Sequence, residues 1–165
     1  MEDPKLMTKD IVSLSNELLY QRFVFSREQI FRFLNELTMK EYLALHIMDE
    51  TEQDMPPGEG RTYLKNLADR MSMTIRQTST MVKNLKDRGL VTWQHDGDGS
   101  EGTYVIMTAN GRTILRSQEE LTRSYFGDVI REFGAERVIQ LIGLWRELEE
   151  IMRGEIRRRR EAGEV

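Results

Sequence analysis

The sequence predicts a mainly α-helical protein with one small β-hairpin, and three observations support this prediction. Apolar residues recur at helical spacing over most of the chain. The only prolines are Pro4, Pro56 and Pro57, so long helices are permitted almost everywhere else. A single stretch, residues 90–107, contains two runs rich in β-branched and aromatic residues around a loop rich in glycine and aspartate. The predicted order is four helices, two strands and two more helices.

Apolar residues first show helical spacing over residues 8–37, where Ser26 could cap a second helix and so divide the stretch. Thr38 and Glu41 then form a capping-box pattern, which predicts a new helix that ends near Glu50. Residues 51–60 contain two prolines, two glycines and three acids, so we expect a loop there.

The middle of the chain predicts two short helices joined by a tight turn. Residues 64–71 have apolar side chains at positions i, i+3, i+4 and i+7, and Ser72 and Met73 make the connection. Thr74 is the predicted N-cap of the second helix, which stops at Gly89. Thr78, Met81 or Val82, and Leu85 would then face inward.

The predicted hairpin follows at residues 90–94 and 103–107, and two more helices complete the chain. Thr108 is the expected cap of the first, which spans roughly residues 109–127, and the last covers residues 135–160. Helix, turn, helix and hairpin in this order predict a winged helix-turn-helix, in which the second helix enters the major groove of DNA.

The net charge of −4 hides a basic segment. Residues 61–88 carry seven basic and two acidic residues, whereas both flanks are acidic. A local basic patch of this kind is typical of a nucleic-acid contact. Arg76, Gln77 and Thr80 have the chemistry that reads base edges, and lysine or arginine side chains nearby suit phosphates. The predicted DNA-binding residues are Thr74, Arg76, Gln77, Thr80, Lys83, Asn84, Lys65, Lys86 and Arg88.

Composition argues against other classes. The chain has no cysteine, and His46 and His95 lie far apart, so we expect no disulfide, no metal and no cofactor. It has no glycine-rich phosphate loop and no nucleophile elbow, so we do not expect an enzyme. No apolar run reaches the roughly 18 residues of a membrane span, and the first ten residues do not form a signal peptide. We expect a cytoplasmic protein with no membrane partner.

Two segments resemble the MarR family (multiple antibiotic resistance regulators). The run LKNLADRMSMTIRQTSTMVKNLKDRGLV resembles that family's helix-turn-helix, and MTANGRTIL resembles its LTxxGR segment. The resemblance implies three parts: an N-terminal dimerisation helix (1–37), a DNA-binding domain (38–110) and C-terminal dimerisation helices (111–165). It also implies a homodimer on a pseudo-palindromic operator, most simply as a repressor released by a small, often aromatic ligand.

The dimer would bury apolar residues of the end helices, although a helical core within one chain is the alternative. The interface residues expected from the resemblance are Ile11, Leu14, Leu18, Leu141, Trp145, Leu148 and Met152. For the ligand pocket the candidates are Met39, His46 and Met71, with ordinary core packing as the alternative.

The predicted wing departs from the family pattern. The family usually has an acidic residue and an arginine two positions later, where this sequence has Gly99 and Glu101. Asp96, Asp98 and Glu101 make the wing acidic, and phosphates would repel it. Either the wing stays away from DNA, or the protein is a winged-helix dimer that does not bind DNA and acts as a protein-interaction module.

Overall fold

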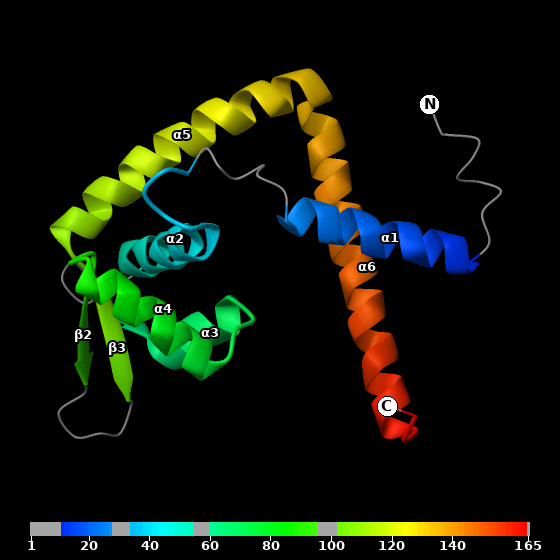
Figure 1. Cartoon of the computed structure of the whole chain (residues 1–165), viewed down its shortest axis with the longest axis horizontal. Coiled ribbons are helices and arrows are strands. Elements are labelled where there is room, and N and C mark those ends of the chain that lie inside the picture. The colour runs from blue at the N-terminus through cyan, green and yellow to red at the C-terminus, as the bar shows by residue number, and fades with distance from the viewer. Residues whose placement is uncertain (1–10, 28–33, 55–59, 96–101, 165) are drawn as a thin grey trace. The chain divides into compact units, whose positions relative to one another are not determined.

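The computed structural model describes residues 11–27, 34–54, 60–95 and 102–164 (Figure 1). These ranges contain six helices and three strands: α1 (Ile11–Arg27), α2 (Met39–Gln53), β1 (Thr62–Tyr63), α3 (Leu64–Arg70), α4 (Ile75–Asp87), β2 (Val91–His95), β3 (Thr103–Met107), α5 (Ala109–Phe133) and α6 (Ala135–Glu161). The chain forms two compact units, Met1–Glu119 and Glu120–Val165. The mainly helical fold with a small hairpin is as predicted.

The three strands form one antiparallel sheet in the order β1-β3-β2. The hairpin register runs from Val91 opposite Met107 to His95 opposite Thr103, so the predicted hairpin is confirmed. Strand β1 was not predicted. It has only two residues and exists because Thr62 pairs with Val105 of β3, a partner more than forty residues away in the sequence.

The core of the first unit lies between α2, α3, α4 and the sheet. Figure 1 shows α3 and α4 beside the hairpin, and α2 close to α4. The residues buried there come from every one of these elements and from α5, and include Leu45, Leu67, Val82, Leu85, Leu90, Val105 and Leu115. Burial of each such side chain contributes about 1.5–3 kcal/mol, which holds α4 firmly on its scaffold.

Helix α2 begins where the sequence predicts and ends later. Thr38 Oγ1 accepts a hydrogen bond from the Glu41 N–H (3.3 Å), and Glu41 Oε2 accepts one from the Thr38 N–H (2.9 Å), so the predicted capping box is confirmed. The helix continues to Gln53 instead of ending near Glu50. The polar residues after Glu50 are compatible with an exposed last turn. Within the predicted loop (51–60), residues 55–59 lie outside the described ranges.

The segment Leu34–Thr38, which we call the connector, corrects another prediction. The apolar spacing predicted a helix to Leu37, but residues 34–38 are not helical. Leu34 and Leu37 are buried, while the backbone N–H groups of Asn35 and Glu36 donate to Gln118 Oε1 of α5 at 3.1 and 3.5 Å. A distant side chain therefore satisfies the donors that a helix would have satisfied locally.

The start of α5 is packed tightly against the start of β2. Thr108 Oγ1 accepts from the Gly111 N–H at 3.0 Å, which confirms Thr108 as the cap. A Cβ atom on Gly111 would lie 2.1 Å from the Leu90 carbonyl oxygen, so only glycine fits at this position. Helix α5 passes through Gly127, its predicted end, and stops at Phe133. A single glycine costs a helix only about 1 kcal/mol, which the neighbouring turns offset.

Candidate nucleic-acid interface

Helix α4 starts at a second capping box. Thr74 Oγ1 accepts from the Gln77 N–H at 3.2 Å, and Gln77 Oε1 accepts from the Thr74 N–H at 3.0 Å. This confirms the predicted N-cap and satisfies two backbone donors of the first turn. The side chains of that turn are therefore presented from a well-defined backbone.

The two faces of α4 divide as the sequence predicts. Thr78, Met81, Val82 and Leu85 are buried in the core. The opposite face is exposed and contains Arg76, Gln77, Thr80, Lys83 and Asn84. An arginine, two amides, a hydroxyl and a lysine thus share one solvent-facing side of a helix. These are the side-chain types that hydrogen-bond base edges and phosphates.

Two of these side chains already have partners inside the helix. Thr80 Oγ1 donates to the Arg76 carbonyl oxygen at 3.0 Å, and the oxygen of the Gln77 amide serves the cap. A contact of Gln77 with an adenine through both amide atoms would require the amide to leave the cap. Arg76 has no such constraint among the described contacts, so its guanidinium can take a new hydrogen-bond partner without breaking the cap.

A groove lies between α4 and the start of α2. Thr38, Lys40, Glu41, Met73, Arg76, Gln77, Thr80, Met81 and Asn84 line it. Lys40 and Arg76 contribute positive charge, and Glu41 is the only acid in this lining. The exposed face of α4 is therefore one wall of a concave surface that carries several polar and charged side chains.

The end of α4 is fixed by both backbone and side-chain contacts. Gly89 has a φ of 70°, and the Leu90 N–H donates to the Leu85 carbonyl at 2.9 Å, so the predicted glycine stop is confirmed. Arg88, predicted to bind phosphate, points to the start of α2: Nη1 lies 3.3 Å from Glu41 Oε1, and Nη2 donates to the Glu36 carbonyl at 2.5 Å.

Lys65 of α3 and Lys86 of α4 are exposed, as phosphate contacts must be. Arg70, at the end of α3, instead lies 2.6 Å from Glu50 of α2. This hydrogen bond, with further help from the charges of His46 and Arg70, holds the pKa of Glu50 below its ordinary range. The ion pair joins α2 to the helix that precedes the turn.

The base of the wing is held by side-chain contacts across the hairpin. The Tyr104 hydroxyl donates to Gln94 Oε1 at 2.8 Å, and Thr103 Oγ1 lies 3.0 Å from His95 Nδ1. The guanidinium of Arg61 lies 4.8 Å from the centre of the Tyr104 ring. Arg61 was part of the basic segment but not among the predicted contacts, since nothing in the sequence shows that it reaches the hairpin. The acidic residues Asp96, Asp98 and Glu101 lie outside the described ranges.

Apolar side chains of the end helices are exposed in the single chain. Of the predicted interface residues, all but Leu148, which is half-buried, have exposed fractions between 37% and 82%. Helix α6, every residue of which the structure describes, has no buried residue. It exposes further large apolar side chains, including Ile139, Ile142, Leu144, Ile151 and Ile156.

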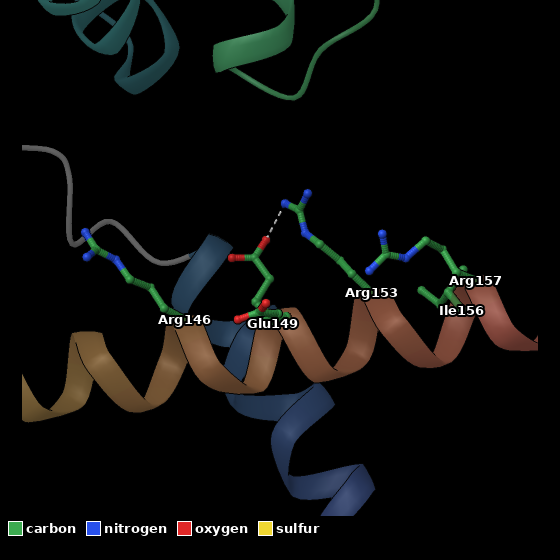
Figure 2. A pocket seen from close by; sticks show the side chains of 6 residues that line it. Arg146, Glu149, Arg153, Ile156 and Arg157 are labelled. Atoms are coloured by element: carbon green, nitrogen blue, oxygen red, sulfur yellow. Dashed lines mark hydrogen bonds and ion pairs between the residues drawn. The ribbon is translucent and has the colours of Figure 1, made fainter.

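A charged strip also runs along α6. Figure 2 shows Arg146, Glu149, Arg153 and Arg157 on the same side of the helix, with a dashed line between Glu149 and Arg153. Arg153 Nη2 lies 2.7 Å from Glu149 Oε1. Farther along the helix, two arginines pair with Glu155, and the hydrogen bond from Arg159 is the main reason that the pKa of this glutamate is lowered. These charges thus pair largely within the helix.

Comparison with known proteins places this geometry in a fold family. No protein-family model matches the sequence, and no curated protein sequence matches it. A MarR family regulator from Neisseria meningitidis matches in structure with a TM-score of 0.64 at 19% identity, over 90% of this chain and 97% of that one. The PcaV transcriptional regulator from Streptomyces coelicolor, solved with its natural ligand, matches with a TM-score of 0.65 at 15% identity, over 91% and 98%. Bordetella bronchiseptica BpsR, whose DNA binding is regulated by 6-hydroxynicotinic acid, has a TM-score of 0.61 at 17% identity, over 85% and 99%.

The chain has the MarR winged helix-turn-helix fold. The fold predicted from the sequence is therefore confirmed over most of the chain. In this fold, α3 and α4 are the two helices of the helix-turn-helix, and β2 and β3 form the wing.

The candidate ligand residues lie in different surroundings in this MarR fold. His46 stacks on Tyr42, and its ring nitrogens lie 3.4 Å from carboxylate oxygens of Glu50 and Glu119. Met39 starts α2 and Met71 caps α3, and both are half-buried. The groove beside α4 is lined by other methionines, Met73 and Met81, so a pocket formed by Met39, His46 and Met71 stays a prediction.

The described residues contain no cluster of three or more acidic or histidine side chains that could hold a metal ion. In the same ranges, no helix is long and apolar enough to cross a bilayer.

Proposed function

We propose that this protein is a DNA-binding transcriptional regulator of the MarR type. One observation carries the proposal: the exposed face of α4 presents Arg76, Gln77, Thr80, Lys83 and Asn84 on a helix that is capped at its start and packed into a core on its other side. A rigid helix with such a face fits the major groove.

The contacts divide by chemistry. Arg76, at the first turn, reads a base, with Gln77 and Thr80 beside it and Thr74 at the cap. Lys65, Lys83 and Lys86 neutralise phosphates and so set register and orientation. Asn84, on the next turn of the same face, contacts the backbone or a base edge. Arg61, held over the Tyr104 ring, adds a positive charge beside strand β3 of the hairpin.

We infer that the regulator is a homodimer. Large apolar side chains are exposed on α1 and also on α6 in one chain, and exposed apolar side chains in such number on a helix favour an interface. A two-fold dimer would bring two copies of α4 to half-sites about one helical turn, or roughly 10 bp, apart. The proposed division into residues 1–37, 38–110 and 111–165 follows from this arrangement.

We further propose release by a small aromatic ligand, which would make the protein a repressor that acts in the cytoplasm. Two proteins of the same fold support this class: PcaV was solved with a natural ligand, and 6-hydroxynicotinic acid regulates DNA binding by BpsR. A ligand that favours one separation of the two recognition helices would change the affinity for both half-sites together.

The test is binding to the DNA upstream of the protein's own gene, measured by fluorescence anisotropy at several salt concentrations. For a regulator, the logarithm of the binding constant falls steeply with the logarithm of the salt concentration. Arg76→Ala combined with Lys83→Ala should weaken binding and flatten this slope by about one to two. The matched control combines Arg123→Ala with Arg131→Ala, which removes the same charge from the exposed side of α5.

The alternative is a winged-helix dimer that binds a protein instead of DNA. The acidic residues of the wing loop and the net charge of −4 favour it. Absence of DNA binding even at low salt, by a protein that is folded and dimeric, would support this alternative and refute the regulator.

A further inference from the structure

Arg88 is the last basic residue of the segment 61–88, and its side chain, although 39% exposed, has two partners within the protein. It is the C-cap residue of α4, and its two terminal guanidinium nitrogens reach Glu41 of α2 and the Glu36 carbonyl of the connector. Nη1 lies 3.3 Å from Glu41 Oε1, and Nη2 donates to the Glu36 carbonyl oxygen at 2.5 Å. One side chain therefore joins the end of α4 to two points near the start of α2.

The two acceptors of Arg88 are themselves held in place. The other oxygen of Glu41 accepts hydrogen bonds from the Thr38 N–H and hydroxyl, both at 2.9 Å, and this carboxylate side chain is only 12% exposed. The Glu36 N–H, on the connector, donates to Gln118 of α5, whose side chain is fully buried. Arg88 thus binds a preformed acceptor site, anchored by both α2 and α5.

We propose that Arg88 is a positioning residue that sets the angle of α4 through Glu41 and the connector, and that it does not bind phosphate. This proposal rests on the DNA-binding function proposed above. The charge of Arg88 is already balanced by Glu41, so transfer of the guanidinium to a phosphate would leave a largely buried carboxylate without its partner.

The geometry gives this contact a mechanical role. Arg76 lies twelve residues before Arg88, which corresponds to about 18 Å along the helix axis. A tilt of about 5° at the Arg88 end would move the first turn by about 1.5 Å. A shift of that size takes a hydrogen bond of 2.9 Å beyond the limit at which it still contributes. The core residues of α4 hold the helix in place, and the Arg88 contact restricts its tilt.

Three variants separate positioning from phosphate binding. Arg88→Lys keeps the positive charge, but the single ammonium of lysine cannot bind the Glu41 carboxylate and the Glu36 carbonyl together as the planar guanidinium does. Glu41→Gln removes the negative charge yet can still complete the capping box, because glutamine serves at that position as well as glutamate. Lys86→Ala is the matched control, since it removes one exposed charge from the same helix.

Each variant is measured for binding to the upstream DNA as a function of salt, after thermal unfolding shows that it is folded at the assay temperature. Arg88→Lys should weaken binding about tenfold, as expected for loss of a charged hydrogen bond, with an unchanged salt slope. Glu41→Gln should also weaken binding, about threefold to tenfold, although removal of a negative charge would by electrostatics alone strengthen it. Lys86→Ala should lower the slope by about 0.9.

The opposite results would overturn the proposal. Arg88 contacts phosphate if Arg88→Lys binds like the unchanged protein while the slope of log K against log salt becomes shallower by about 0.9 in Arg88→Ala. Tighter binding by Glu41→Gln would also refute the positioning role. If the unchanged protein does not bind DNA at low salt, the proposed function itself fails and this role fails with it. Should Arg88→Lys be unfolded, Glu41→Gln decides between the outcomes.

Discussion

The packing at Gly111 permits a quantitative prediction about stability. In Gly111→Ala, the new Cβ would lie 2.1 Å from the Leu90 carbonyl oxygen and 2.9 Å from Met107 Cγ, so the carbonyl must move by about 1 Å. That oxygen accepts hydrogen bonds from the Thr108 N–H at 3.0 Å and the Thr108 hydroxyl at 3.1 Å. The substitution therefore combines overpacking with the weakening of two hydrogen bonds.

The magnitude follows from these terms. Overpacking costs about 1–3 kcal/mol, and the two hydrogen bonds contribute about 1 kcal/mol each. Alanine regains about 1 kcal/mol as the better helix former. The net loss in the free energy of unfolding is about 2–4 kcal/mol, which for a chain of this length lowers the Tm by about 5–15 °C.

The assay is urea unfolding followed by circular dichroism, at one fixed protein concentration because a dimer is stabilised by mass action. Gly127→Ala is the control, since it makes the same substitution in the same helix where nothing lies within 4 Å of the new Cβ. This control should be stabilised by about 0.4–1 kcal/mol. If Gly111→Ala changes stability by less than about 0.5 kcal/mol, or stabilises the protein like Gly127→Ala, the reasoning from close contact is wrong.

Three more predictions concern a buried amide, an ion pair and the proposed dimer. Gln118→Ala leaves the N–H groups of the connector without their acceptor, so unfolding in urea should show a loss of about 2–4 kcal/mol, and a loss under 0.5 kcal/mol would contradict it. The Arg70 hydrogen bond lowers the pKa of Glu50 in the folded protein, so its contribution is present at neutral pH and lost on acidification. The stability difference between the unchanged protein and Glu50→Gln should therefore close between about pH 5 and pH 3, and a constant difference would exclude this linkage. Trp145→Glu places a charge in the proposed interface, so sedimentation velocity at micromolar concentration should show monomers, whereas an unchanged dimer would place the interface elsewhere.

The parts of the fold that were predicted correctly depend on neighbours in the sequence. A capping box needs two residues three positions apart, and the α4 box at Thr74 and Gln77 was found for that reason. Gly89 ends α4 through its own backbone conformation. The buried and exposed faces of α4 follow from helical periodicity alone. These short-range rules were sufficient to locate the candidate DNA-reading face.

The errors arose where distant residues compete with local preference. Leu34 and Leu37 have helical spacing, but their segment forms the connector because Gln118 supplies hydrogen-bond acceptors from 82 and 83 residues away. Strand β1 is too short to recognise without its partner β3. The partners of Arg88 could not be predicted for the same reason: its place in a basic run is visible in the sequence, whereas its acceptors, 47 and 52 residues earlier, are not.

The sequence by itself thus determined the order of the helices, the ends of α4 and the side chains on its exposed face, because helix periodicity and capping act within a few residues. Only the tertiary structure decided how that helix is held, which arginines are already paired and which glycine cannot be replaced. Those properties depend on atoms that the fold brings together from distant parts of the chain, and no local pattern encodes such distances.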